Sequence, residues 1–129
     1  MKRIMSVILG MAFVFVGSLH FVRPAGFLAI MPSWIPFHLF WVYASGVVEI
    51  AGGLGLLIPR YRKVAGWILF VLLIVVFPAN INMAVNEIQL PGRDPMPVWA
   101  MWARLPLQFV LLFLVWWSAI KEKTVPREE

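Results

Sequence analysis

The sequence predicts an all-α protein: an integral membrane four-helix bundle with both termini cytoplasmic. Apolar residues make up 62% of the 129 residues and charged residues only 13%, and the mean hydropathy is +0.88. Soluble domains hold about 25% charged residues, far more than this chain has to cover a surface in water. The apolar residues also fall into four runs, each near the roughly 20 residues that a bilayer-spanning helix needs. This composition excludes a soluble enzyme, a nucleic-acid-binding protein and a disordered tail.

Charged residues and prolines bound the apolar runs and define the expected helices. The expected spans cover residues 4–22, 37–58, 64–83 and 98–120. Arg23 follows the first run, Pro59 the second and Lys121 the fourth, and such residues are typical of helix ends. The connection after the first span should contain a short interfacial helix over residues 26–32. Only short loops remain, so we expect a single domain over residues 1–129.

The positive residues are distributed unequally between the two sides of this topology. The side with both termini and the loop between the second and third spans carries eight of the 11: Lys2, Arg3, Arg60, Arg62, Lys63, Lys121, Lys123 and Arg127. The other side carries Arg23, Arg93 and Arg104. Cytoplasmic loops are the ones enriched in Lys and Arg. The sequence therefore predicts a multi-pass protein of the cytoplasmic (inner) membrane with its N- and C-termini inside.

Polar residues inside the spans are the candidate functional residues, because an ionisable side chain at the centre of a membrane helix costs about 2.5–3.5 kcal/mol. Glu49 lies near the middle of the second expected span, and His20 lies near the outer end of the first. Asn80 lies in the outer part of the third span, and Arg104 and Gln108 lie in the outer half of the fourth. Each helix thus contributes a polar residue to one layer, which predicts a polar pocket that opens toward the outside.

Neighbouring residues support a site at this depth. Ser45 precedes Glu49 by one helical turn, so the two share a face. Pro78 and Pro106 each free a backbone carbonyl four residues earlier, those of Ile74 and Trp102, and freed carbonyls at membrane depth need a partner. The candidate ligand-binding residues are therefore His20, Ser45, Glu49, Asn80, Arg104 and Gln108.

Structural interpretations of the same residues remain open. Glu49 could pair with Arg104 only to fix helix register, or it could be protonated, since burial disfavours the anion. Arg104 could instead extend toward the membrane surface. Asn80 could join two helices by hydrogen bonds, and the glycine-rich stripe of the second span could serve only close helix packing.

The sequence offers no redox centre or catalytic motif. It contains no Cys, which excludes disulfides, thiolate metal sites and iron–sulfur clusters. Its two histidines fall short of a usual metal or haem ligand set. We therefore expect no metal site and no covalently bound cofactor, and no catalytic residue is assigned.

Four segments together resemble the DoxX family of small bacterial four-helix membrane proteins. They are Gly17–Phe21 followed by Pro24, Ser45–Glu49, Pro78–Met83 and Arg104–Gln108, one segment per expected span. The family name derives from a subunit of a thiosulfate:quinone oxidoreductase, so the resemblance implies a possible role in quinone-linked electron transfer. More distant relatives carry redox-active cysteine pairs, and that chemistry does not transfer to a chain without Cys.

The resemblance implies an accessory or quinone-interacting subunit of a membrane redox or stress-related system. It would be a non-catalytic subunit, with the lipid bilayer, a quinone or small apolar ligand, a membrane or soluble redox protein, and further copies of itself as candidate partners. Two alternatives remain: a transporter or permeation protein for a small solute or protons, and a structural assembly subunit without a ligand.

Overall fold

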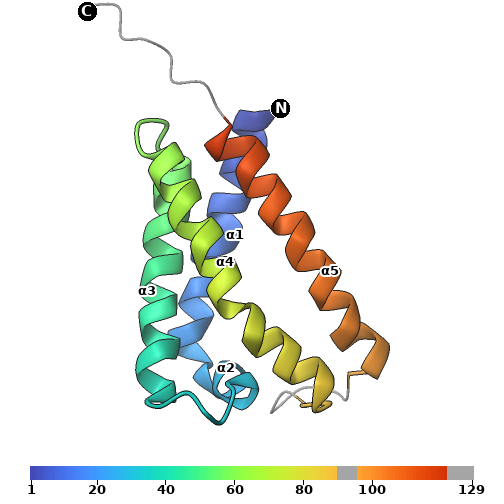
Figure 1. Cartoon of the computed structure of the whole chain (residues 1–129). Coiled ribbons are helices and arrows are strands. Elements are labelled where there is room, and N and C mark those ends of the chain that lie inside the picture. The colour runs from blue at the N-terminus through green and yellow to red at the C-terminus, as the bar shows by residue number, and fades with distance from the viewer. Residues whose placement is uncertain (90–95, 122–129) are drawn as a thin grey trace, which may run out of the picture.

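The computed structural model describes residues 1–89 and 96–121, and these residues form helices without any strand. In chain order the helices are α1 (Lys2–Val22), α2 (Pro24–Ile30), α3 (His38–Leu57), α4 (Arg62–Val85), α5 (Val98–Val115) and a π-helical turn, η1 (Trp116–Ile120), which continues α5 (Figure 1). The all-α prediction is confirmed for the described part of the chain.

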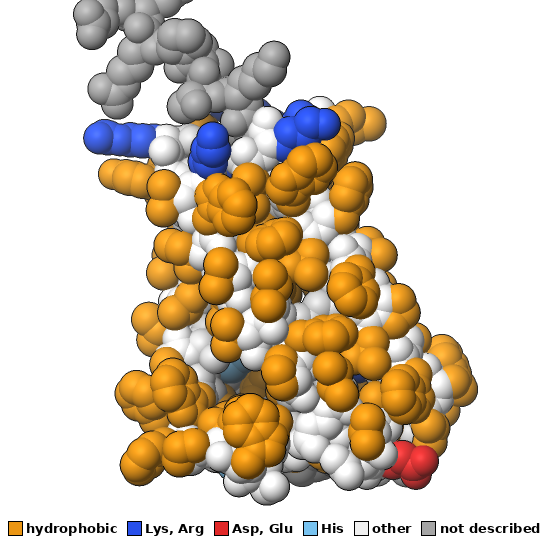
Figure 2. Space-filling view, in the orientation of Figure 1, with side chains coloured by type: hydrophobic (Ala, Val, Ile, Leu, Met, Phe, Trp, Pro, Cys, Tyr) orange, Lys and Arg blue, Asp and Glu red, His pale blue; other side chains and the backbone are white. Residues whose placement is uncertain are grey.

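Four of these helical stretches are long and apolar enough to cross a membrane, which indicates a membrane protein. They are Lys2–Val22, His38–Leu57, Arg62–Val85 and Val98–Ile120. Both ends of each stretch lie within two residues of the boundaries expected from the sequence. Figure 2 shows hydrophobic side chains over most of the visible face, with Lys and Arg gathered at the end where the chain begins. Lipid tails would cover such an apolar surface, whereas water would not solvate it well.

The expected short helix is present as α2, which begins two residues earlier than predicted. Pro24 occupies its first turn, where a proline has the backbone angle that a helix needs and loses no hydrogen bond. The helix lies at the end of the bundle opposite the N-terminus (Figure 1). Asn82 of α4 donates a hydrogen bond of 3.0 Å from Nδ2 to the carbonyl oxygen of Ile30, which ties the end of α2 to α4.

Helices α1 and α3 pack with their backbones in direct contact. A Cβ atom added at Gly53 would lie 2.7 Å from the carbonyl oxygen of Gly10. A Cβ atom at Gly17 would lie 3.0 Å from the carbonyl oxygen of Gly46. Small residues allow membrane helices to approach this closely. Close packing therefore accounts for this half of the glycine stripe.

The other side of α3 contacts the first half of α4. A Cβ atom at Gly52 would lie 2.7 Å from the side chain of Leu69, and one at Gly55 would lie 2.6 Å from Cβ of Ala65. Leu56 and Leu69 are completely buried in the core at this level. Helix α3 is thus fixed between α1 and α4, with one face packed against each of them.

The bundle is closed at the end that bears the N-terminus and spreads toward the other end. At the closed end, Ser6 of α1 donates a hydrogen bond of 3.1 Å to the carbonyl oxygen of Ser118 in η1. Ala119 is completely buried there and lies against Gly66 of α4. Figure 1 shows α5 diverging from α1 below this point. Figure 1 also shows α4 bending away from α3 in its second half, which contains Pro78, and a proline inside a helix commonly causes such a bend.

The α1–α3 contact gives a test of this packing. We expect Gly53→Ala to lower the free energy of unfolding by about 1–3 kcal/mol, because the added methyl group meets backbone atoms that cannot rotate away. Ala51→Leu, which enlarges an exposed side chain of the same helix, should change it little. Unfolding in detergent followed by circular dichroism measures both. Equal stability of the two variants would contradict the backbone contact.

Candidate functional site

A cavity of about 380 Å³ lies between the helices, from the middle of the bundle toward its spread end. Residues of α1, α2, α3, α4 and α5 all line it. Figure 2 shows a recess between hydrophobic side chains in the lower half of the visible face. Sites for small molecules commonly enclose about 300–1,000 Å³ and combine an apolar lining with a few polar groups. This cavity has both properties.

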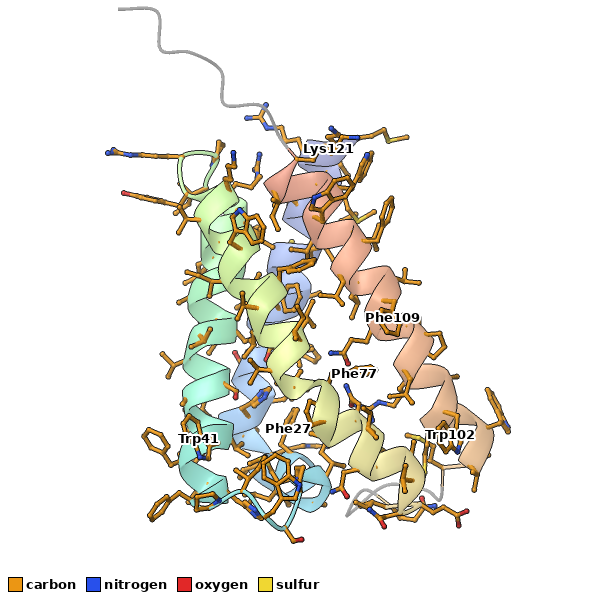
Figure 3. The ribbon with its side chains drawn as sticks, viewed as in Figure 1. Phe27, Trp41, Phe77, Trp102, Phe109 and Lys121 are labelled. Carbon is orange, nitrogen blue, oxygen red and sulfur yellow. The ribbon has the colours of Figure 1, made fainter. Side chains whose placement is uncertain are left out.

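All six residues that the sequence singled out line this one cavity: His20, Ser45, Glu49, Asn80, Arg104 and Gln108. They come from four different helices, which bring their side chains to the same cavity inside the bundle. The rest of the lining is almost entirely apolar and includes Phe13, Phe27 and Trp41. Phe27 and Trp41 lie toward the spread end of the bundle (Figure 3). A role for these residues in binding stays a prediction.

His20 is held in a defined orientation by its neighbours. Its Nδ1 lies 2.9 Å from the carbonyl oxygen of Val16, one turn earlier in α1. A carbonyl oxygen only accepts hydrogen bonds, so Nδ1 carries the proton and donates. The ring stacks on Phe27 of α2, with 3.8 Å between the ring centroids and 17° between the planes. These two contacts fix the ring, so the position of the second nitrogen, Nε2, is also fixed.

Glu49 faces this second nitrogen across the α1–α3 contact. Its Oε2 lies 3.6 Å from Nε2 of His20, and the two residues are only 9% and 6% exposed. Among the described residues, the ionisable side chain that faces Glu49 is therefore His20, and not Arg104 as one structural interpretation held. Ser45 lies one turn before Glu49 on the same wall. These three residues form the polar wall of the cavity on the α1–α3 side.

The amide side chains of Asn80 and Gln108 bond to each other on the opposite wall. Nδ2 of Asn80 donates to Oε1 of Gln108, and Nε2 of Gln108 donates to the carbonyl oxygen of Leu73. Leu73 precedes the bend at Pro78, so the acceptor lies next to Ile74, whose carbonyl the sequence analysis expected to need a partner. Both polar atoms of Gln108 are occupied. This network joins α4 to α5, and the interpretation of Asn80 as a helix-joining residue fits it.

Arg104 lies on the α4–α5 side of the cavity and is half-buried. Its Nη1 donates to Sδ of Met83 at 3.2 Å. Met83 is completely buried with Met101 in a second core cluster between α4 and α5. The guanidinium group is charged at all ordinary pH values, so it makes this side of the cavity electropositive.

Phe27 is the main lining residue that the sequence analysis missed. Its contact with His20 depends on how α2 folds back over the bundle, and no spacing along the chain determines that. The one available signal was Pro24 at the start of an apolar stretch. Among residues 1–89 and 96–121, no group of three or more His, Cys, Asp or Glu residues could hold a metal ion.

Comparison with known proteins places the whole cavity in one family domain. Residues 9–119 match a family described as a domain of unknown function, DUF8561. The chain belongs to this family. The match begins in α1 and ends in η1, so it includes every residue that lines the cavity. No curated protein and no solved structure gives a match.

The amide network gives a second prediction. Gln108→Leu should lower the free energy of unfolding by roughly 1–2 kcal/mol, because it leaves the Asn80 amide and the Leu73 carbonyl without this partner. A double-mutant cycle with Asn80→Leu should give a coupling of about 0.6–1.7 kcal/mol, the range for hydrogen bonds between membrane helices.

The matched control is Asn86→Leu, which alters an exposed amide directly after α4 and outside the cavity. It should change the stability of the protein little. Strictly additive effects of the Asn80 and Gln108 substitutions would show that these side chains do not act through each other.

Proposed function

We propose that this chain is a DoxX-like protein of the cytoplasmic membrane that holds a quinone in its cavity, as an accessory subunit of a membrane redox or stress-related system. The observation that carries the proposal is the buried His20–Glu49 pair on the wall of an otherwise apolar cavity. A quinone needs an apolar space for its ring and tail and polar partners for its two oxygen atoms. The cavity offers both.

The segments that resemble the DoxX family coincide with the cavity. His20, Glu49 and Asn80 come from three of these segments, and the fourth contributes both Arg104 and Gln108. If the likeness reflected only hydrophobic composition, its polar residues would have no reason to share one cavity. This coincidence supports both the kinship and a ligand-binding role.

The shape of the bundle favours entry of the ligand from the lipid. The bend of α4 and the divergence of α5 spread the helices at one end, and the visible recess lies between hydrophobic side chains (Figures 1 and 2). A quinone dissolved in the bilayer would meet such an opening directly. The electrons would belong to the bound quinone and to a partner protein, because the chain has no Cys and no redox-active motif of its own.

The closed end of the bundle argues for a binding site over a transport path. A path for a solute must at some stage connect the cavity with both sides of the membrane. Here Leu56, Leu69 and Val115 are completely buried beyond the cavity and fill the bundle interior. A ligand in the cavity would therefore exchange with the lipid or with the spread end.

The proposed orientation has both termini in the cytoplasm. Alkaline phosphatase fused after residue 88, between α4 and α5, should be active in a bacterial host, and the same enzyme fused after residue 121 should be inactive. Green fluorescent protein fused after residue 121 should fluoresce, because it folds in the cytoplasm. Phosphatase activity at the C-terminal fusion would contradict this orientation.

Quinone binding is tested through the tryptophan that lines the cavity. Short-tailed ubiquinone and menaquinone analogues should saturably quench part of the tryptophan fluorescence of the purified protein in detergent, because Trp41 lines the cavity, and should raise the melting temperature of the protein. Arg104→Ala should weaken binding at least about tenfold, which corresponds to the loss of one hydrogen bond to a charged group.

The control is Arg60→Ala, which removes an arginine of the connection between α3 and α4 that does not line the cavity, and it should bind like the wild type. An alkane of similar length, which lacks the quinone ring, should not give saturable quenching. Absence of saturable quenching by any quinone in folded wild-type protein would refute the proposal.

A further inference from the structure

We propose that the cavity binds its ligand in the reduced, phenolic form in preference to the quinone form, and that the phenolic O–H takes the place of a proton between His20 and Glu49. This inference rests on the proposed function, because it concerns the redox form of the quinone that the cavity holds. It follows from the hydrogen-bonding groups that the cavity wall presents.

The orientation of His20 determines what its free nitrogen can do. Nδ1 donates to the carbonyl oxygen of Val16, so a neutral ring carries its single proton there. Nε2 then has a lone pair and only accepts hydrogen bonds. It becomes a donor only when the ring takes a second proton and becomes charged. Turning the ring over to present Nδ1 instead would break the hydrogen bond to the Val16 carbonyl.

Glu49 presents a second acceptor to the same space. An ionised carboxylate only accepts hydrogen bonds. With a neutral His20, two lone-pair-bearing atoms face each other at 3.6 Å, beyond the range of a direct hydrogen bond. Both residues are largely buried at the cavity wall, and polar atoms that face an apolar space without a donor are unfavourable. The pair therefore needs a hydrogen-bond donor, which is a proton, a water molecule, or the O–H group of a ligand that displaces the water.

The two redox forms of a quinone differ in this respect. A quinol has phenolic O–H groups and can donate to Nε2 or to the carboxylate, and Ser45 lies one turn away as a further partner. A quinone has only carbonyl oxygens, so it can bond to the pair only while the pair already holds a proton. Quinol can therefore bind to the unprotonated pair, whereas quinone binding to the pair requires that the pair take up or keep a proton.

Among the described residues, the other helices bring one further charged group to the cavity. Arg104 of α5 lines it, whereas the lining residues of α2 and α4 include no titratable side chain. Arginine does not titrate at the pH values used, so we expect the pH dependence of binding to come from His20 and Glu49.

The test compares decylubiquinol with decylubiquinone under anaerobic conditions, using Trp fluorescence of the wild-type protein in detergent. At pH 8.5 the quinol should bind at least about tenfold more tightly than the quinone, as expected for a hydrogen bond to a charged group. The preference should shrink at pH 6, where the pair holds a proton more often. In weakly buffered solution at pH 8.5, quinone binding should take up protons and quinol binding should not.

A matched pair of variants tests whether Glu49 causes the preference for the quinol form. Glu49→Gln supplies its own N–H donor to Nε2, so it should bind both redox forms with affinities within about threefold of each other and lose the pH dependence. Glu87→Gln makes the same change at an exposed position after α4, and it should keep the wild-type preference. Melting curves show whether both variants are folded. If Glu49→Gln does not fold, the comparison of quinol and quinone binding to the wild-type protein still tests the inference.

The outcomes separate this inference from the proposed function. Saturable binding of both forms with equal affinity at pH 8.5, or tighter binding of the quinone, would overturn the inference and leave a quinone site in place. A preference for quinol that persists in folded Glu49→Gln would also overturn it. Absence of saturable binding of either form would overturn both proposals.

Discussion

The backbone contact between α1 and α3 is the constraint on which the polar wall of the cavity depends. Gly46 lies where the two helices cross closely, and a Cβ atom added to it would lie 2.8 Å from Cβ of His20. Glu49 follows Gly46 by three residues, so it lies on the neighbouring turn of the same face. A side chain at position 46 would push α1 outward and separate the two polar residues. The packing of the helices and the geometry of the site therefore have one cause.

The cavity itself results from helix geometry. Glycine contacts hold α3 against α1 and against the first half of α4, and η1 closes the bundle at that end. Beyond Pro78 the second half of α4 bends away from α3, and the described side chains leave the cavity of about 380 Å³ on this side of the bundle. A proline in a membrane helix exposes backbone polar groups, which must find partners inside the protein. Pro78 frees the carbonyl of Ile74, and Gln108 bonds the carbonyl of its neighbour Leu73, so Gln108 joins α5 to α4 close to the bend.

The depth of each residue could be predicted from the sequence, because span boundaries and the fixed rise of a helix determine it. This reasoning selected six residues that line one cavity. The rotation of each helix and the identity of its neighbours are set by tertiary packing, and here the sequence reasoning was less complete. It considered Arg104 as the partner of Glu49, whereas the α1–α3 contact brings His20 there. It also missed the stacking of Phe27, which depends on how α2 folds back over the bundle.

A preference for the quinol form would give the chain a role in redox chemistry without any redox centre of its own. A site that binds the reduced form more tightly raises the midpoint potential of the bound couple, by thermodynamic linkage. For a two-electron couple, each factor of ten in relative affinity corresponds to about 30 mV. The bound quinone would then accept electrons from a partner more readily than quinone free in the lipid. An accessory subunit would thus direct electron flow through two buried side chains, while the electrons themselves pass between the quinone and the partner.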